Sequence, residues 1–61
     1  MHKDDFRFFN KGQFMKMVLK DGFVVYGTIH EFMDDALVFE TKEALSLIAY
    51  DHIHLIMEKR R

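Results

Sequence analysis

Few residues in this sequence have the types and the spacing that a metal site or an active site requires. The histidines are the first candidates, as metal ligands. His52 and His54 stand two positions apart, so their imidazoles would share one face of a strand, and His30 could join them. A zinc site needs three or four ligands in tetrahedral reach, and the sequence has no Cys to complete the set. Asp34 and Asp35 form a carboxylate pair, but adjacent acids in a turn usually face water. We therefore expect no metal and no other cofactor.

Catalysis has no better support, because the groups that make or activate a nucleophile are missing. The sequence has no Cys nucleophile, no glycine-rich phosphate loop and no Ser in a nucleophile-elbow context, so we expect that the protein is not an enzyme. Cations gather near both ends of the chain. In an assembly of many copies, these cations could form a basic band that binds phosphates. Alternatively, they only keep the chain soluble. These cations are Lys3, Arg7, Lys11, Lys59, Arg60 and Arg61.

The size of the chain limits what can hold such groups in place. It has 61 residues, of which 49% are hydrophobic and 15% aromatic, with no Cys and a formal net charge of −1. A domain this short buries only about 60% of its unfolded surface, so it usually needs disulfides, a metal or self-association. Without Cys, we expect an unusually good core or association of several copies. The near-neutral charge argues against a dedicated duplex binder, and the absence of Cys and of an export signal favours a cytoplasmic location.

The first dozen residues predict a short helix. Asp4 or Asp5 can cap it, and Phe6 and Phe9 share one face at a spacing of three, so residues 4–11 form one helical turn. A segment this short cannot hold a helix alone, so the Phe pair must dock on a larger element. A frayed arm with opportunistic Phe packing is the alternative.

The remainder of the chain follows the apolar period of two that strands show. Asp21-Gly22 is a preferred hairpin pair, and Gly27 lies inside a long run of β-forming residues, where glycine marks a bulge or a sharp bend. A helix over residues 36–49 is the alternative for that segment. The predicted strands span residues 13–20, 23–32, 36–41, 44–49 and 53–58.

These elements predict a single domain over residues 1–61 that is mostly β. The short helix at 4–11 precedes a small, strongly bent, five-stranded antiparallel barrel at 13–58, and residues 59–61 form a basic tail. An open barrel of this size leaves unpaired edge strands, and a head-to-tail contact between edges closes a ring when the rotation between copies closes. The expected partner is therefore the chain itself.

Two segments resemble the Sm and Sm-like family. Leu19-Lys20-Asp21-Gly22, four residues, Gly27-Thr28-Ile29, two residues and then Phe32 are similar to the first signature of that family. Tyr50-Asp51-His52, within the stretch from Leu45 to Ile56, resembles the Tyr-Lys-His segment of its bacterial Hfq branch. The resemblance spans about residues 6–58.

The resemblance implies a fold, an assembly and a ligand. The fold is an N-terminal helix on an SH3-like small barrel, and the assembly is a homo-oligomeric ring of five to seven subunits in which the fourth strand pairs with the neighbour's fifth. The ligand is single-stranded RNA, held around the pore. The implied RNA-binding candidates are Met33, Asp34, Tyr50 and His52. The implied subunit-interface candidates are Leu45, Leu47, Ile48, Ile53, Leu55 and Met57.

The sequence departs from the family where RNA would bind. The loop after Phe32 has an acid shifted by one place and lacks the family's aromatic or Asn, and Asp51 replaces the Hfq-like Lys. Carboxylates repeated around a ring would repel phosphate. We therefore expect a ring protein that binds single-stranded RNA or scaffolds RNA-associated assemblies. A protein-interaction module that kept the barrel and lost the RNA site is the alternative.

Overall fold

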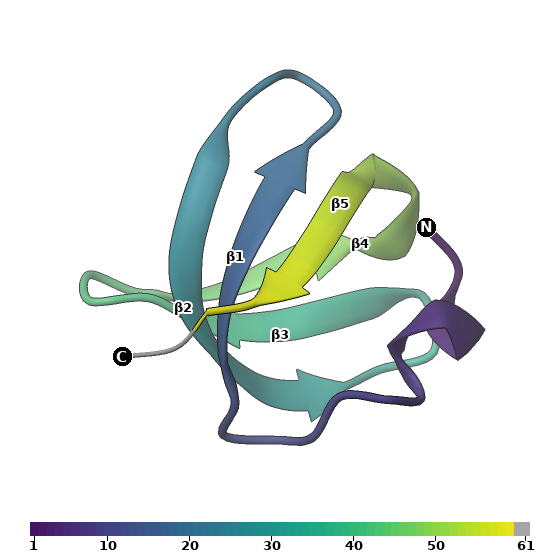
Figure 1. The fold of residues 1–61 in the computed structure, drawn as a ribbon, viewed down its shortest axis with the longest axis horizontal. Helices are drawn as coiled ribbons and strands as arrows, with labels where there is room; N and C mark the ends of the chain where they lie inside the picture. The colour runs from purple at the N-terminus through teal and green to yellow at the C-terminus, as the bar shows by residue number, and fades with distance from the viewer. Residues whose placement is uncertain (60–61) are drawn as a thin grey trace.

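The described part of the chain, residues 1–59 of a computed structural model, is a curled sheet with two single-turn helices (Figure 1). Arg60 and Arg61, which belong to the predicted basic tail and to the cations proposed for a basic band, lie outside the described residues. The elements in chain order are η1 (Lys3–Phe6), β1 (Phe14–Leu19), β2 (Val24–Phe32), β3 (Ala36–Glu40), β4 (Leu45–Ala49), η2 (Tyr50–His52) and β5 (Ile53–Glu58).

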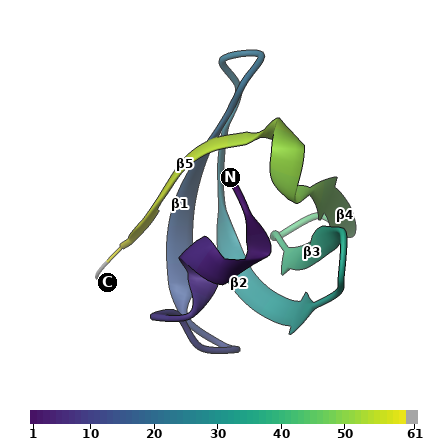
Figure 2. The ribbon, with the colours of Figure 1, turned by 90° about the vertical axis from the view of Figure 1, so that its right-hand side faces the viewer.

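All neighbouring strands pair antiparallel in the order β4-β3-β2-β1-β5. The prediction of five antiparallel strands is confirmed, and the alternative of a helix over residues 36–49 is wrong, because that segment forms β3 and β4. The sheet does not close: β4 and β5 are its two edges, and η2 links them across the gap (Figures 1 and 2).

Gly27 is the point where β2 turns the sheet over on itself. A Cβ built at this position would clash with the carbonyl oxygen of Glu40 and approach Cε2 of Phe39 to 2.9 Å. The backbone of β3 therefore passes directly over Gly27, which only a residue without a side chain permits. β2 accordingly pairs with β1 from Val24 to Thr28 and with β3 only from Thr28 onward.

The core fills the concave side of the curl with residues from every strand except β4, and with one aromatic residue from each helical turn. Met15 and Met17 are fully buried, as their alternation in the sequence predicts. Ile48 of β4 packs against this core only in part. The buried set is Phe6, Met15, Met17, Ile29, Leu37, Phe39, Tyr50, Ile53 and Ile56.

A β-bulge changes the expected pattern of β5. Strict alternation predicts Ile53, Leu55 and Met57 on one face, but the partner of Leu19 is Ile53 while the partner of Val18 is Leu55. His54 is the extra residue, so the faces switch after it and Ile56 enters the core instead. Leu55 and Met57 consequently lie on the outer face, opposite Ile53.

The helix predicted over residues 4–11 is shorter than expected. η1 is a 3-10 turn of four residues, and its N-cap is His2, whose imidazole accepts from the Asp4 N–H while the Asp5 carboxylate accepts from the His2 N–H. One turn suffices because Phe6 is buried and packs against Phe9, as the shared face predicts. Phe9 lies beyond the turn and packs against the core without being helical.

The first hairpin turn also differs from the prediction. Of the two predicted turn residues, Gly22 has a positive φ, at +94°, and Asp21 does not. The Gly22 N–H donates to the Leu19 carbonyl and the Leu19 N–H to the Phe23 carbonyl, which gives a longer turn than the expected two residues. The Asp21 carboxylate accepts from the Phe23 N–H and fixes the turn.

Candidate functional site

The two polar loops that the resemblance singles out meet at one end of the curled sheet. The Tyr50 hydroxyl donates to the Met33 carbonyl at 2.7 Å, and the Tyr50 N–H donates to the Asp35 carbonyl at 3.2 Å. The backbone nitrogen of Met1 donates to the carbonyls of Tyr50 and Ile53 at 2.9 and 3.0 Å. The turn after β2, the η2 turn and the first residue of the chain therefore form one cluster, which we call the loop cluster (residues 1–3, 33–35 and 50–52).

Tyr50 holds this cluster together from the inside. Its side chain is 4% exposed, and its ring lies 5.2 Å from that of Phe6. Burial raises the pKa of the Tyr50 phenol, since the charged form would lose its hydration. A ring packed in this way cannot offer a face to a base, so as placed here Tyr50 is a structural residue rather than an RNA contact.

His52, Met33 and Asp34 remain accessible, but the charges around them are mainly negative. Nε2 of His52 lies 3.3 Å from Oδ2 of Asp21, and the Lys3 ammonium lies 3.3 Å from Oδ1 of Asp34. Asp34, Asp35 and Asp51 are all exposed near the loop cluster. The accessible surface here is suited to cations or hydrogen-bond donors and unsuited to a phosphate backbone.

A metal site has no geometric support among residues 1–59, where no three His, Asp or Glu side chains stand close enough to hold an ion. His30 approaches the Glu40 carboxylate to 4.0 Å, and His52 approaches Asp21, so two of the histidines suggested as ligands lie beside different acids. His54 lies at the bulge of β5.

An exposed cation–aromatic pair follows η1 and was not singled out from the sequence. The guanidinium carbon of Arg7 lies 4.7 Å from the ring centroid of Phe8, and Phe8 is 75% exposed. Lys3 and Lys11 stand nearby in sequence, each paired with an acid, Asp34 or Glu31. The sequence does carry a signal for the exposure of Phe8, because Phe8 does not lie on the helical face that Phe6 and Phe9 share.

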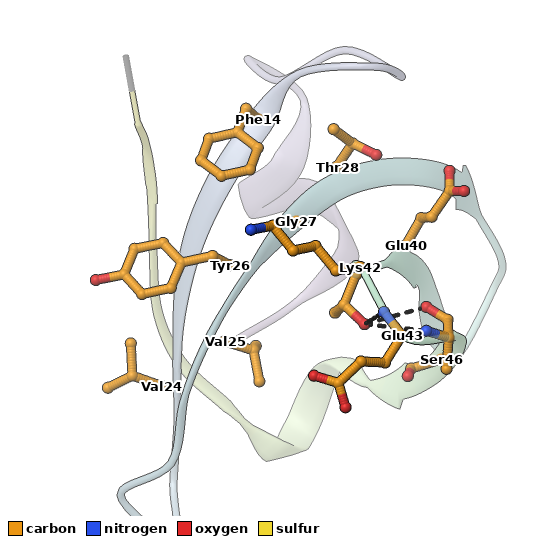
Figure 3. A pocket seen from close by; sticks show the side chains of 12 residues that line it. Phe14, Val24, Val25, Tyr26, Gly27, Thr28, Glu40, Lys42, Glu43 and Ser46 are labelled. Atoms are coloured by element: carbon orange, nitrogen blue, oxygen red, sulfur yellow. Dashed lines mark hydrogen bonds between the residues drawn. The ribbon is translucent and has the colours of Figure 1, made fainter. Parts of the chain in front are cut away.

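An open cleft of about 930 Å³ lies between the first half of β2 and the β3–β4 turn (Figure 3). The β3–β4 turn forms one side of the cleft, and in this turn the Thr41 hydroxyl donates to the Ala44 carbonyl and accepts from the Ala44 N–H. Its floor is apolar around Val24 and Tyr26, and Lys42 lies at its rim among acids. The cleft holds no cluster of catalytic groups.

The predicted interface residues fall into two groups. Four of them project from the two edge strands into solvent: Leu45 and Leu47 from β4, and Leu55 and Met57 from β5. Ile48 is half-buried against the core, and Ile53 is fully buried within it. A contact between edges would therefore use the four exposed side chains and the outward-facing backbone groups of β4 and β5. Ile53 would take no direct part, because it anchors β5 in the core.

The chain has no detectable relatives in the comparisons made. No protein-family model, no curated protein and no solved structure matches it. Within residues 1–59, no helix has the length and apolar character to cross a membrane.

Proposed function

We propose that this chain is the subunit of a homo-oligomeric Sm-like ring. The observation that carries the proposal is that both edges of the sheet are free and both expose apolar side chains on its outer face. Leu45 and Leu47 project from β4, and Leu55 and Met57 project from β5. Unpaired edges flanked by leucines are unfavourable in water and favour strand addition from another copy.

Pairing of β4 with the β5 of a neighbour would complete both edges at once. The two strands have five and six residues, so most of their backbone groups could pair. The exposed side chains of both strands lie on the same face, so Leu47 of one copy would meet Leu55 or Met57 of the next. Because the two edges differ, the contact is head-to-tail, and a suitable angle between copies closes a ring.

The Sm-like identity of the barrel is supported by particular features, each of which the resemblance implies. The fourth and fifth strands occupy the two edges, the second strand bends at Gly27, and the loops at Met33 and Tyr50 meet. These features agree with the resemblance, although no family model matches the chain.

We propose further that the ring binds single-stranded RNA, with the Arg7–Phe8 pair as its principal contact. An exposed aromatic ring beside a guanidinium offers stacking for a base and a cation for a phosphate. The loop cluster contributes less, because Tyr50 is buried and the acids around His52 repel phosphate. Repetition around a ring would add avidity to a weak single site.

The assembly is tested by charge substitutions at the edges. L47K places an ammonium where the neighbour's β5 would lie, and V24K is the matched control, because Val24 is also exposed but belongs to a central strand. Size-exclusion chromatography with light scattering should show smaller species for L47K and the wild-type mass for V24K. Equal masses for all three proteins would refute pairing through β4.

RNA binding is tested by fluorescence anisotropy with short oligo-U and oligo-A over a salt series. Affinity should fall as salt rises, and F8A and R7A should weaken it several-fold each. D51K is the informative contrast, because it restores the cation that the Hfq branch has at this place. If wild type does not bind at low salt but D51K does, the RNA site has been lost and the protein-interaction module is the better description.

A further inference from the structure

The outer face of β2, β1 and β5 carries an apolar patch with one ammonium at its centre. Lys16 pairs across the sheet with Tyr26 on one side and with Met57 on the other. Phe14 and Val18 flank it along β1. The patch, which we call the Lys16 face, consists of Phe14, Lys16, Val18, Val24, Tyr26, Thr28, Leu55 and Met57.

The Lys16 face is accessible. Val24, Tyr26, Leu55 and Met57 are between 39% and 47% exposed, although all four are large apolar or aromatic residues. Figure 3 shows Val24 and Tyr26 projecting from one side of β2, while Val25 points to the other. Val25 packs against the core, so it is the residues on the outer side that are left uncovered.

Charge sets the Lys16 face apart from an ordinary exposed sheet surface. Its other members are uncharged, and within residues 1–59 Lys16 forms no ion pair. The charged residues Glu40, Lys42 and Glu43 lie at its border, where they line a cleft shared with Val24, Tyr26 and Thr28. Lys3 and Lys11, in contrast, each lie beside a carboxylate. Lys16 is half-buried as a residue and lies between Tyr26 and Met57 on the neighbouring strands. A cation in an apolar setting of this kind is complementary to an anion presented by an equally apolar surface.

We propose that the Lys16 face docks an amphipathic helix of a partner protein, with an Asp or Glu in the helix's apolar stripe pairing with Lys16. Three adjacent strands span about 10 Å, which matches the ~10 Å diameter of a helix. The length of β1 from Phe14 to Val18, about 14 Å, accommodates roughly nine helical residues. A second copy docked face to face would instead oppose Lys16 with Lys16.

The site lies within one subunit and does not depend on the ring or on RNA. Edge pairing would leave Leu55 and Met57 on the outer face of the sheet, where the neighbour's Leu45 and Leu47 would lengthen the apolar surface. The Arg7–Phe8 pair belongs to a different segment, after η1. Loss of helix binding and loss of RNA binding are therefore separate outcomes.

The test uses a synthetic amphipathic helical peptide of about 14 residues with a Leu stripe and a single Glu in the middle of that stripe. Matched peptides carry Gln or Lys in place of the Glu. Titration into isotopically labelled protein should shift amide signals of β1, β2 and β5, and the Glu peptide should bind about tenfold more tightly than the Gln peptide, or 1.4 kcal/mol.

K16M keeps the aliphatic stem and should remove the preference for the Glu peptide, while K16E should favour the Lys peptide. K3M is the control, because Lys3 lies on η1, where it pairs with Asp34 and is not part of the Lys16 face, and it should behave as wild type. Unchanged melting temperatures would show that the variants fold.

Three results would overturn the proposal. The first is equal binding of the Glu and Gln peptides to wild type, and the second is shifts confined to β4. The third is a preference for phosphatidylserine vesicles over the Glu peptide that disappears in K16M, since the occupant would then be a lipid surface.

Discussion

The hydroxyl of Tyr50 donates a hydrogen bond to the carbonyl oxygen of Met33 at 2.7 Å, which ties η2 to the turn that follows β2. η2 links the two edge strands, β4 and β5, and this bond ties that link to the β2–β3 turn. Because the Tyr50 ring also packs on Phe6, the same side chain connects η1, the loops and the core. The buried phenol thus organises this end of the molecule.

Replacement of Tyr50 by Phe should destabilise the fold without changing its shape. The ring and its packing on Phe6 remain, but the Met33 carbonyl loses its donor, which costs about 1–2 kcal/mol. Urea unfolding followed by circular dichroism measures the change. Y26F is the control: Tyr26 is about half exposed, so its loss of a hydroxyl should change stability by less than about 0.5 kcal/mol.

The same phenol should make the protein sensitive to alkaline pH. Burial raises the pKa of Tyr50 in the folded state above its ordinary value near 10.0, so the neutral form is favoured by folding. The stabilisation from the neutral phenol is complete at pH values below the pKa of Tyr50 in the unfolded state. It is lost as the pH rises through the pKa of Tyr50 in the folded state. Stability should therefore fall above about pH 10. The decline should be shallower in Y50F, and identical slopes would argue against a buried phenol.

Substitution of Gly27 by Ala should be among the most damaging single changes. The added methyl would meet the Glu40 carbonyl and the Phe39 ring, neither of which can move without disturbing β3, so we expect a loss of about 2 kcal/mol or more. Gly22 is the matched control because its surroundings are open and only its positive φ opposes a side chain. G22A should cost about 1 kcal/mol. Thermal unfolding of both variants makes the comparison.

The ion pair of Lys11 with Glu31 should be visible in the titration of the carboxylate. The Lys11 ammonium lies 2.7 Å from Oε1 of Glu31, and its hydrogen bond, followed by that of the Phe32 N–H, lowers the pKa of Glu31. Because the pKa of Glu31 is lower in the folded state, its carboxylate stabilises the fold at pH values above its pKa in the unfolded state. This stabilisation is lost as the pH falls through its pKa in the folded state. In K11M, side-chain NMR should show the Glu31 pKa shifted upward toward 4.5. K42M, a cation on the distant β3–β4 turn, should leave it unchanged.

Strand positions were predictable because the apolar period of two is strong in this sequence. Met15 and Met17 show it clearly, and Gly27 interrupts an otherwise regular run where the bend occurs. What could not be predicted is the placement of bulges. The extra residue in β5, His54, depends on how β1 and β5 meet across the sheet, and this moved Leu55 to the surface and Ile56 into the core.

The candidate site was harder to predict than the fold. Proximity of the loops at Met33 and Tyr50 was implied by the resemblance, but whether a Tyr in a loop faces solvent or the core depends on tertiary packing. Here Phe6 and the Met33 carbonyl are both in reach, so the ring turns inward. The Arg7–Phe8 pair and the Lys16 face became evident only once exposure was known.

We propose that copies of this chain assemble through the free edges of β4 and β5. Sedimentation velocity of the wild-type protein at micromolar concentration, combined with native mass spectrometry, tests it most directly. We expect one closed species with an integral number of 7.4 kDa subunits, whose mass stays the same as the protein is concentrated further. A monomer across this range, or an open series of masses that grows with concentration, would contradict it.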